Sequence, residues 1–369
     1  MVRTRALRFL LILGLIALLL PVSLAQADGH EGSGTATIRD AVIGGDPFAG
    51  DTPVTVRSGR LVLAMSGVEA LSDSDTMALE GWLVSDDGER KQSIGILEIG
   101  EDGSVNHEFV ADPGENLFAA FDKAVVTLEA IPDTDPEPSA ETVFSGMLLE
   151  GVRDQVRALH VPGEEGTPPA LGLVEQVELA LVSARHARGS ASTGDLEMAR
   201  THAACAVGII QGSADCGDGV GVGAYADAVI AAAVAAKEAA EAAEPVDEAA
   251  AKASDDTIAA ATSARDRAQQ AVAAAGLGSD ATNSQVATLH MGNVVDHLGD
   301  NGASGAAASA YTSSQDIGSY AVGAPKLPAT GEPLIPQMAR YGLIGSIVLV
   351  VLGSALFFGT RRRSEGSGA

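Results

Sequence analysis

The sequence has few of the residues that build nucleic-acid-binding surfaces and metal sites. In 369 residues it holds two cysteines and one tryptophan, and its 23 lysine and arginine residues face 49 aspartate and glutamate residues. The formal net charge of −26 repels the phosphates of nucleic acids and anionic lipids. No patch of basic residues with interleaved aromatics lies between the two termini. The composition therefore predicts no nucleic-acid partner.

Familiar catalytic and cofactor motifs are also missing. There is no GxSxG nucleophile motif, and the run GVGVGAY at 219–225 does not follow a strand pattern, so it is not a dinucleotide loop. Asp215 and Asp218 stand three apart in a glycine-rich loop without the bidentate glutamate of an EF-hand. We therefore expect no enzymatic activity and no cofactor.

The N-terminus has the pattern of a secretory signal peptide. Three arginines, Arg3, Arg5 and Arg8, precede the apolar run FLLILGLIALLL. Ala25 and Ala27 form a small-x-small cleavage site, with Asp28 as the expected first residue of the mature chain. Residues 1–27 are therefore predicted to be a signal peptide, and an uncleaved N-terminal anchor is the alternative.

The C-terminus predicts a membrane span followed by a short cytoplasmic tail. Residues 341–359 carry no charge, and about 20 apolar residues suffice for a helix to cross a bilayer. Arg361, Arg362 and Arg363 follow immediately, which places the tail (360–369) in the cytoplasm by the positive-inside rule. Everything before the span is then predicted to lie outside, as a protein of the extracytoplasmic face of the cell envelope.

The pentapeptide LPATG before this span resembles the LPXTG sorting signal of bacterial surface proteins. It comprises Leu327, Pro328, Ala329, Thr330 and Gly331. The resemblance implies that a sortase thiolate cuts after Thr330 and transfers the chain to a cell-wall amine. Pro328 favours the extended backbone that such a substrate needs. A plain single-span anchor with an accidental pentapeptide is the alternative.

The two cysteines predict a structural disulfide. Cys205 and Cys216 stand 11 residues apart, one near the end of a helical pattern and one in a Gly/Asp loop. Outside the cytoplasm such a pair is oxidised, and closing so short a loop adds about 3 kcal/mol of stability. A thiolate metal site is not favoured, because the sequence has no CxxC motif.

Residues 34–147 have the alternating pattern of β-strands. Apolar and polar residues alternate over six to eight positions, and the turn signals DDG and EDG separate several runs. We expect an antiparallel β-sandwich with Trp82 in its core. The runs lie at 60–67, 77–84, 93–100, 105–110, 124–131 and 141–148.

Part of this segment resembles a known family. The stretches EGWLVSDDGERKQSIGILEIGEDGSV and KAVVTLEAIPDTDPEPS resemble the extracytoplasmic C-terminal domain of anti-sigma-K factors of the RskA type, over about 61–146. The matching positions are Trp82, Gly95, Asp102-Gly103 and Val126-Thr127-Leu128-Glu129. The resemblance implies a shared fold. Because the cytosolic sigma-binding domain of that family has no counterpart here, it does not imply anti-sigma activity.

Residues 148–298 change to the period of helices. Alanine-rich segments with apolar stripes are separated by Gly, Pro or Ser/Thr clusters, which predicts an α-helical bundle of four to six helices. Small polar residues dominate 299–326, which we expect to be a flexible stalk with room for one weak helix at its start. The predicted fold class is thus α+β and multidomain, with an N-terminal sandwich, a bundle and a C-terminal transmembrane helix.

Five histidines lie in the helical half. His290 and His297 are seven apart on one helix, while His186 and His202 lie on consecutive helices that can face each other. Such groups can bind a transition metal or haem in a bundle, but no HxxxH or ExxH pair accompanies them. The alternative is that each of these four histidines, and His160, has no ligand and lies half-buried or on the polar face of its helix.

Together these patterns predict a non-enzymatic binding or structural protein, exported and anchored at the cell surface, with an unknown extracellular protein or ligand as partner. The first alternative is a metal- or haem-binding bundle. The second is an envelope sensor or regulator that acts through a membrane partner with its own cytosolic domain.

Overall fold

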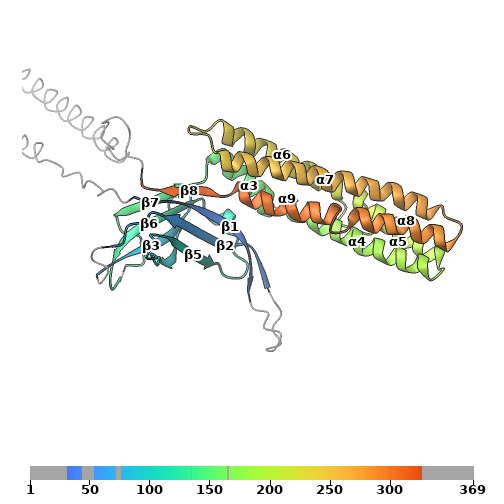
Figure 1. Cartoon of the computed structure of the whole chain (residues 1–369), viewed down its shortest axis with the longest axis horizontal. Coiled ribbons are helices and arrows are strands. Elements are labelled where there is room, and N and C mark those ends of the chain that lie inside the picture. Colours follow the sequence, from blue (N-terminus) through green and yellow to red (C-terminus); the bar gives the residue numbers. More distant parts are fainter. Residues whose placement is uncertain (1–30, 44–53, 72–75, 134, 164–165, 326–369) are drawn as a thin grey trace, which may run out of the picture. The chain divides into compact units, whose positions relative to one another are not determined.

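The computed structural model describes residues 31–43, 54–71, 76–133, 135–163 and 166–325 (Figure 1). The predicted signal peptide, the LPATG motif, the span at 341–359 and the tail lie outside these ranges. Among the described residues, no helix combines the length and the apolar character needed to cross a membrane. The described residues up to Ala324 form one compact unit of an antiparallel sheet and helices, which confirms the predicted α+β class.

One curled antiparallel sheet takes the place of the expected two-sheet sandwich. Among the described residues it has eight strands in the order β4-β3-β6-β7-β8-β1-β2-β5. The sheet curls until its two edges approach, so that Nε2 of His107 on β5 lies 2.7 Å from the carbonyl oxygen of Ile94 on β4. The strands are β1 (Ser33–Ile43), β2 (Val54–Ser66), β3 (Met77–Val84), β4 (Lys91–Ile96), β5 (Val105–Val110), β6 (Lys123–Ala130), β7 (Thr142–Met147) and β8 (Tyr320–Gly323).

Alternation along the strands sends one set of side chains into the core of the curled sheet. Ile38 of β1 and Leu61 and Leu63 of β2 are at most 1% exposed, whereas their neighbours are more accessible. Trp82 is buried as expected, at 2% exposed, and donates a 2.9 Å hydrogen bond from its indole N–H to Oγ1 of Thr127. The hydrogen bond satisfies the indole donor, which is the usual requirement for a buried tryptophan.

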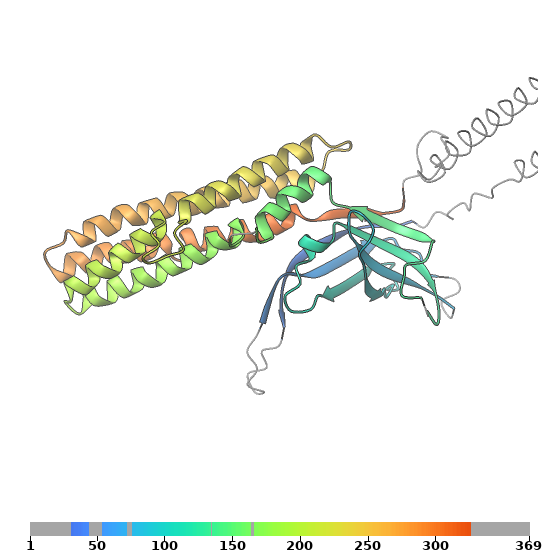
Figure 2. The same ribbon diagram turned by 180° about the vertical axis from the view of Figure 1, so that it is seen from behind.

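Between β7 and β8 the chain makes a long helical excursion, seen from both sides in Figures 1 and 2. The helices pack side by side in four antiparallel columns within the described residues: α3 with α4, α5 with α6, α7 alone, and α8 with α9. Their bounds are α3 (Glu150–His160), α4 (Pro169–Ser192), α5 (Leu196–Gln211), α6 (Val222–Glu241), α7 (Glu248–Ser279), α8 (Ser284–Leu298) and α9 (Ala303–Ile317); the short α2 (Leu117–Ala120) precedes β6.

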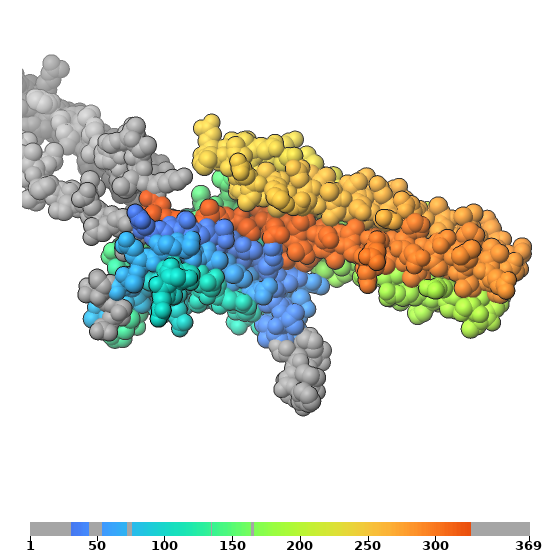
Figure 3. All heavy atoms as spheres, viewed as in Figure 1, coloured from blue at the N-terminus to red at the C-terminus, as the bar shows by residue number. Residues whose placement is uncertain are grey.

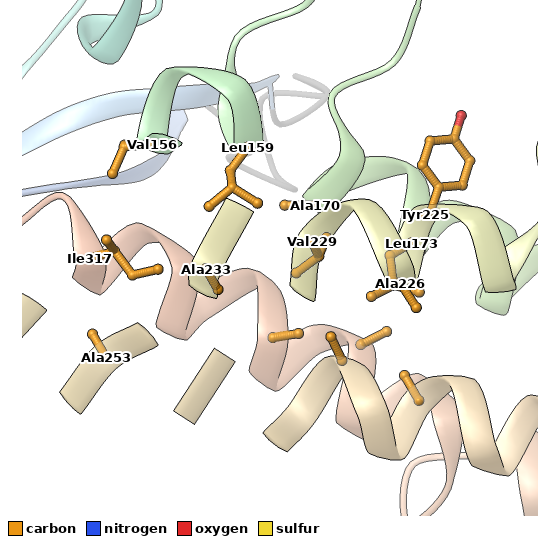
Figure 4. Close-up of a cluster of buried hydrophobic side chains, with 14 of the residues drawn as sticks. Val156, Leu159, Ala170, Leu173, Tyr225, Ala226, Val229, Ala233, Ala253 and Ile317 are labelled. Atoms are coloured by element: carbon orange, nitrogen blue, oxygen red, sulfur yellow. The ribbon is translucent and has the colours of Figure 1, made fainter. Parts of the chain in front are cut away.

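Small side chains let these helices approach closely. Buried alanines recur along α6 and α7, and a few larger residues fill the space that they leave. Figure 4 shows Val156 and Leu159 of α3, Leu173 of α4, Val229 of α6 and Ile317 of α9 within one apolar cluster. Each of these five side chains is fully buried. Because an alanine buries little area, these larger residues supply much of the hydrophobic stabilisation at this end of the bundle.

The predicted flexible stalk at 299–326 is wrong. Its residues form α9 and then, after Gly318 and Ser319, the strand β8. This strand lies between β7 and β1, with Gly34 opposite Val322 and Ser145 opposite Gly323. The bundle is therefore an insertion in the sheet, and the boundary drawn at 147/148 separates segments of one compact unit.

Gly146 of β7 allows β8 to lie close against β7. A Cβ atom at this position of β7 would lie 2.1 Å from the carbonyl oxygen of Ala321, so only glycine lets β8 come this close. Side-chain packing also holds β8, since Tyr320 and Val322 are at most 4% exposed. The composition of 299–326 left room for a helix at its start, but it gave no indication of the strand.

Candidate functional site

Helix α9 lies against strands β1 and β2, and this contact is called the seam below. Three side-chain contacts cross it from α9: Arg39 pairs with Asp316, and the Tyr311 hydroxyl and the Gln315 amide both donate to the carboxylate of Asp40. Figure 3 shows the blue strands directly beside the orange helix. The seam thus brings residues near 40 and near 315 together, although about 270 residues separate them in the chain.

An irregularity in the β1–β2 pairing shapes the strand side of the seam. Arg39 pairs with Arg60 and Ala41 pairs with Val56, so Asp40 faces three residues of β2. Ser58, in this bulge, has a φ of 48°, which is uncommon for a residue other than glycine. Its backbone N–H donates a 2.8 Å hydrogen bond to Oδ1 of Asp40. The carboxylate therefore holds the bulge in place.

Asp40 is the most heavily hydrogen-bonded carboxylate of the seam. Burial works to raise its pKa, but hydrogen bonds from the Ser58 N–H, Arg57, Gln315 and Tyr311 outweigh burial and hold the pKa below its usual value. The Arg57 bond is 2.9 Å long and the Gln315 bond 2.7 Å. Asp40 is thus a fixed anion at neutral pH, and its lone pairs are already occupied.

A cavity of about 460 Å³ opens at the seam, and we call it the seam pocket. Its charged wall comes from β1 and β2, and its apolar wall from α4 and α9. The guanidinium of Arg57 lies 5.7 Å from the centroid of the Tyr311 ring, so a cation covers the aromatic part of the lining. The lining residues are Arg39, Asp40, Arg57, Arg60, Leu171, Val174, Ala308, Tyr311, Thr312 and Gln315.

Three arginines and one carboxylate give this lining a net charge of +2 in a chain whose formal charge is −26. Arg39 and Arg60 are directly opposite each other on neighbouring strands, an arrangement that costs free energy because their like charges repel. Burial and the charge of Arg60 both lower the pKa of Arg39. The lining itself is therefore positively charged, and the carboxylates that partly offset Arg39 and Arg60, Asp316 and Glu108, lie just outside it.

Two guanidinium nitrogens of this pocket have unused donors. Nη1 of Arg39 and Nε of Arg60 are buried and have no hydrogen-bond partner among the described residues. Arg60 has a loose ion pair with Glu108 at 3.8 Å, and Arg39 bonds Asp316 through its other terminal nitrogen. A buried donor without an acceptor is costly, so these two atoms mark where an acceptor is missing.

The predicted histidine candidates are only partly brought together. The rings of His186 and His202 lie 5.3 Å apart between centroids on α4 and α5, as their spacing suggested. His290 and His297 are half-buried on α8. Among the described residues no group of three or more His, Cys, Asp or Glu side chains is arranged to hold a metal ion.

The fifth histidine has a structural environment at the seam. His160, at the end of α3, is 4% exposed and packs between the rings of Phe118 and Tyr311 at centroid distances of 5.5 and 5.4 Å. Its Nε2 lies 3.0 Å from Oγ of Ser314. His160 thus supports the helix that carries Tyr311 and Gln315 to the pocket.

Cys205 and Cys216 form the expected disulfide, with Cα atoms 5.5 Å apart. The bond joins the last turns of α5 to the loop before α6, where Gly212 ends α5 in a left-handed conformation. In the same loop Asp218 accepts a 2.6 Å hydrogen bond from the Tyr225 hydroxyl and bonds the Val220 N–H. The disulfide and these bonds fix the break between the two helices of one column.

A second polar cluster lies within the sheet and is satisfied internally. Glu80 and Glu129 are buried, at 7% and 4% exposed. Glu80 accepts from Ser93, and Glu129 accepts from Thr127 and from the Ser139 N–H at 2.8 Å. Burial and the neighbouring Asp133 and Glu129 raise the pKa of Glu80, although the Ser93 bond lowers it. These contacts hold the strands of the sheet and a neighbouring loop together, so the cluster has a structural role.

The seam pocket itself was missed at the level of sequence. Arg57 and Arg60 stand three apart in the sequence. Two features that form the pocket, the pairing of Arg60 with Arg39 and the contact of α9 with β1, depend on residues far apart in the chain. Comparisons with family models, with curated proteins and with solved structures found no match to the chain. The geometry of the seam and the two terminal sequence patterns are therefore the features that indicate function.

Proposed function

We propose that this chain is an exported, non-enzymatic binding protein that its C-terminal segment holds at the outer face of the cell envelope. The observation that carries the binding role is the seam pocket, a cavity with positive lining and unused donors between the strands β1 and β2 and the helices α4 and α9. The N-terminal apolar run, the LPATG motif and the uncharged stretch before three arginines support the location.

The chemistry of the lining favours binding over catalysis. Asp40, the only carboxylate that lines the pocket in the described part of the chain, is held as an anion by four partners, so it is a poor proton acceptor. Burial followed by the charge of Asp40 raises the pKa of the Tyr311 hydroxyl, which therefore stays protonated. Arginines bind and orient anions but do not exchange protons near neutral pH.

The anti-sigma-K-like sequence of the sheet fits this proposal as a fold relationship. The segment with this resemblance, 61–146, covers strands β3 to β7 and part of β2, whereas β1 and β8 lie outside it. Only residues 324–326 separate the end of β8 from Leu327. If sortase acts at Thr330, the sheet is attached close to the wall, without the stalk that the composition suggested.

Surface location is tested in intact cells of the source organism. Protease added outside should digest the chain, and lysozyme should release the wild type and an Ala329→Ser variant, whose change is at the variable position of the motif. Thr330→Ala should stay with the membrane and require detergent, because the acyl-transfer site is lost. If all three need detergent, wall attachment is wrong and only the anchor remains; if protease leaves the chain intact, the proposed location is wrong.

A further inference from the structure

The unused donors of Arg39 and Arg60 indicate what the seam pocket lacks. Both nitrogens belong to side chains that line the same cavity and stand opposite each other on β1 and β2. Residues directly opposite in an antiparallel pair have Cβ atoms about 5 Å apart, so their guanidinium groups can reach one ligand group. Bound jointly to an oxyanion, they would lose both their mutual repulsion and their missing acceptors.

We propose that the seam pocket binds a small organic dianion, a phosphomonoester or a dicarboxylate with an apolar body. The charge follows from the lining, which carries +2, and the oxygen acceptors follow from the fork geometry of guanidinium groups. The apolar body follows from the opposite wall, where Leu171, Val174 and Ala308 face the cavity beside the ring of Tyr311. This inference rests on the proposed function, because it names the ligand class of the same site.

The roles within the pocket divide between positioning and binding. Arg57 is occupied by Asp40 and lies over Tyr311, so it positions the bulge and completes the charged wall. Arg60 is the freer group, since its ion pair with Glu108 spans 3.8 Å and its Nε has no partner among the described residues. Asp316 occupies one terminal nitrogen of Arg39, and the other is buried without a partner among the described residues, so a ligand reaches it only if the side chain turns toward the cavity.

The overall negative charge of the chain does not prevent such binding. At an ionic strength of 0.15 M the Debye length is about 8 Å, so carboxylates farther from the pocket are largely screened, while the lining arginines act on a bound ligand at contact distance. High salt should weaken the binding, because the ligand and the lining attract each other electrostatically. The negative surface is expected to slow association more than it weakens the final complex.

The test is calorimetric titration of the full-length chain in an uncharged detergent at pH 8, where a phosphomonoester carries two charges. Phenyl phosphate and phthalate are the dianions, benzyl alcohol is the neutral analogue and inorganic phosphate lacks an apolar body. We expect at least one dianion to bind, and the one that binds tighter distinguishes phosphate from carboxylate recognition. Benzyl alcohol and inorganic phosphate should bind at least tenfold more weakly.

Arg60→Gln should weaken that binding by about tenfold to a hundredfold, the usual effect of removing a charged hydrogen-bond donor. Arg185→Gln, an exposed site on α4 away from the pocket, is the matched control and should leave affinity unchanged. Arg60→Lys keeps the charge but loses the fork, so an intermediate loss is expected, and this variant serves if the glutamine variant unfolds.

Failure of both dianions to bind the wild type, equal affinity for benzyl alcohol, or an Arg60→Gln variant as tight as Arg185→Gln would overturn the proposed ligand class. None of these results bears on surface location, which protease and lysozyme test separately. Conversely, tight phenyl phosphate binding by a chain that protease cannot reach would contradict the location and leave the ligand class standing.

Discussion

Val322→Asp should destabilise the native sheet by more than about 4 kcal/mol. Val322 is 1% exposed in β8, between β1 and β7, so the substitution places a carboxylate without a partner in the core of the sheet. Ala321→Asp is the matched control, because the adjacent side chain is exposed on the other face of the same strand. It should change stability by no more than about 0.5 kcal/mol.

The lone tryptophan makes this comparison simple to measure. Trp82 lies in β3 of the sheet, so its fluorescence follows the unfolding of the sheet, while circular dichroism at 222 nm follows the helices. In urea titrations of the full-length chain, the fluorescence midpoint of Val322→Asp should fall far below that of Ala321→Asp. Equal midpoints for the two variants would indicate that residues after 318 are a stalk and that β8 does not belong to the sheet.

Acidification from pH 7 to pH 4.5 should cost about 2 to 3 kcal/mol of stability through His160 alone. Burial between Phe118 and Tyr311 lowers the pKa of His160 to about 4, with Arg39 adding to the shift and Ser314 and Asp40 opposing it. In the unfolded chain the ring takes up a proton near pH 6.5. Protons therefore favour the unfolded chain as pH falls from about 6.5 to 4, and below 4 the loss is complete.

His160→Gln removes this titration, so its stability should fall less than that of the wild type over the same pH range. His290→Gln, at a half-buried position of α8, keeps His160 and should follow the wild type. Asp40 does not affect this comparison. Because its pKa is lowered in the folded chain, the stability that it contributes is lost mainly at pH values below about 3.9. The measurement is the free energy of unfolding from urea titrations at pH 7 and 4.5; parallel losses in all three proteins would exclude His160 as the source.

The elements that local pattern specifies were predictable from the sequence. The strands at 77–84 and 105–110 and the helices from α3 to α8 follow from alternation, apolar stripes and turn residues. The disulfide followed from the presence of only two cysteines at a short spacing. The burial of Trp82 followed from its place in an apolar strand, although its bond to Thr127 did not.

The elements that depend on distant partners were not predictable. Residues 320–323 are too short to show a strand pattern, and they form a strand because β1 and β7 offer two open edges. The seam pocket depends on the position of α9 beside β1 and on a bulge in which Asp40 accepts from the Ser58 N–H. No local sequence pattern indicates either feature. The composition of 299–326, rich in glycine, alanine and serine, fits a helix that packs closely as well as it fits a linker.

The most direct test of this architecture is hydrogen exchange of the full-length chain, followed by mass spectrometry of peptides from 303–325. If β8 completes the sheet and α9 contributes to the apolar wall of the pocket, these amides should exchange over hours, as slowly as those of β1. Exchange within seconds, as in an unstructured linker, would contradict the fold described here and with it the seam pocket.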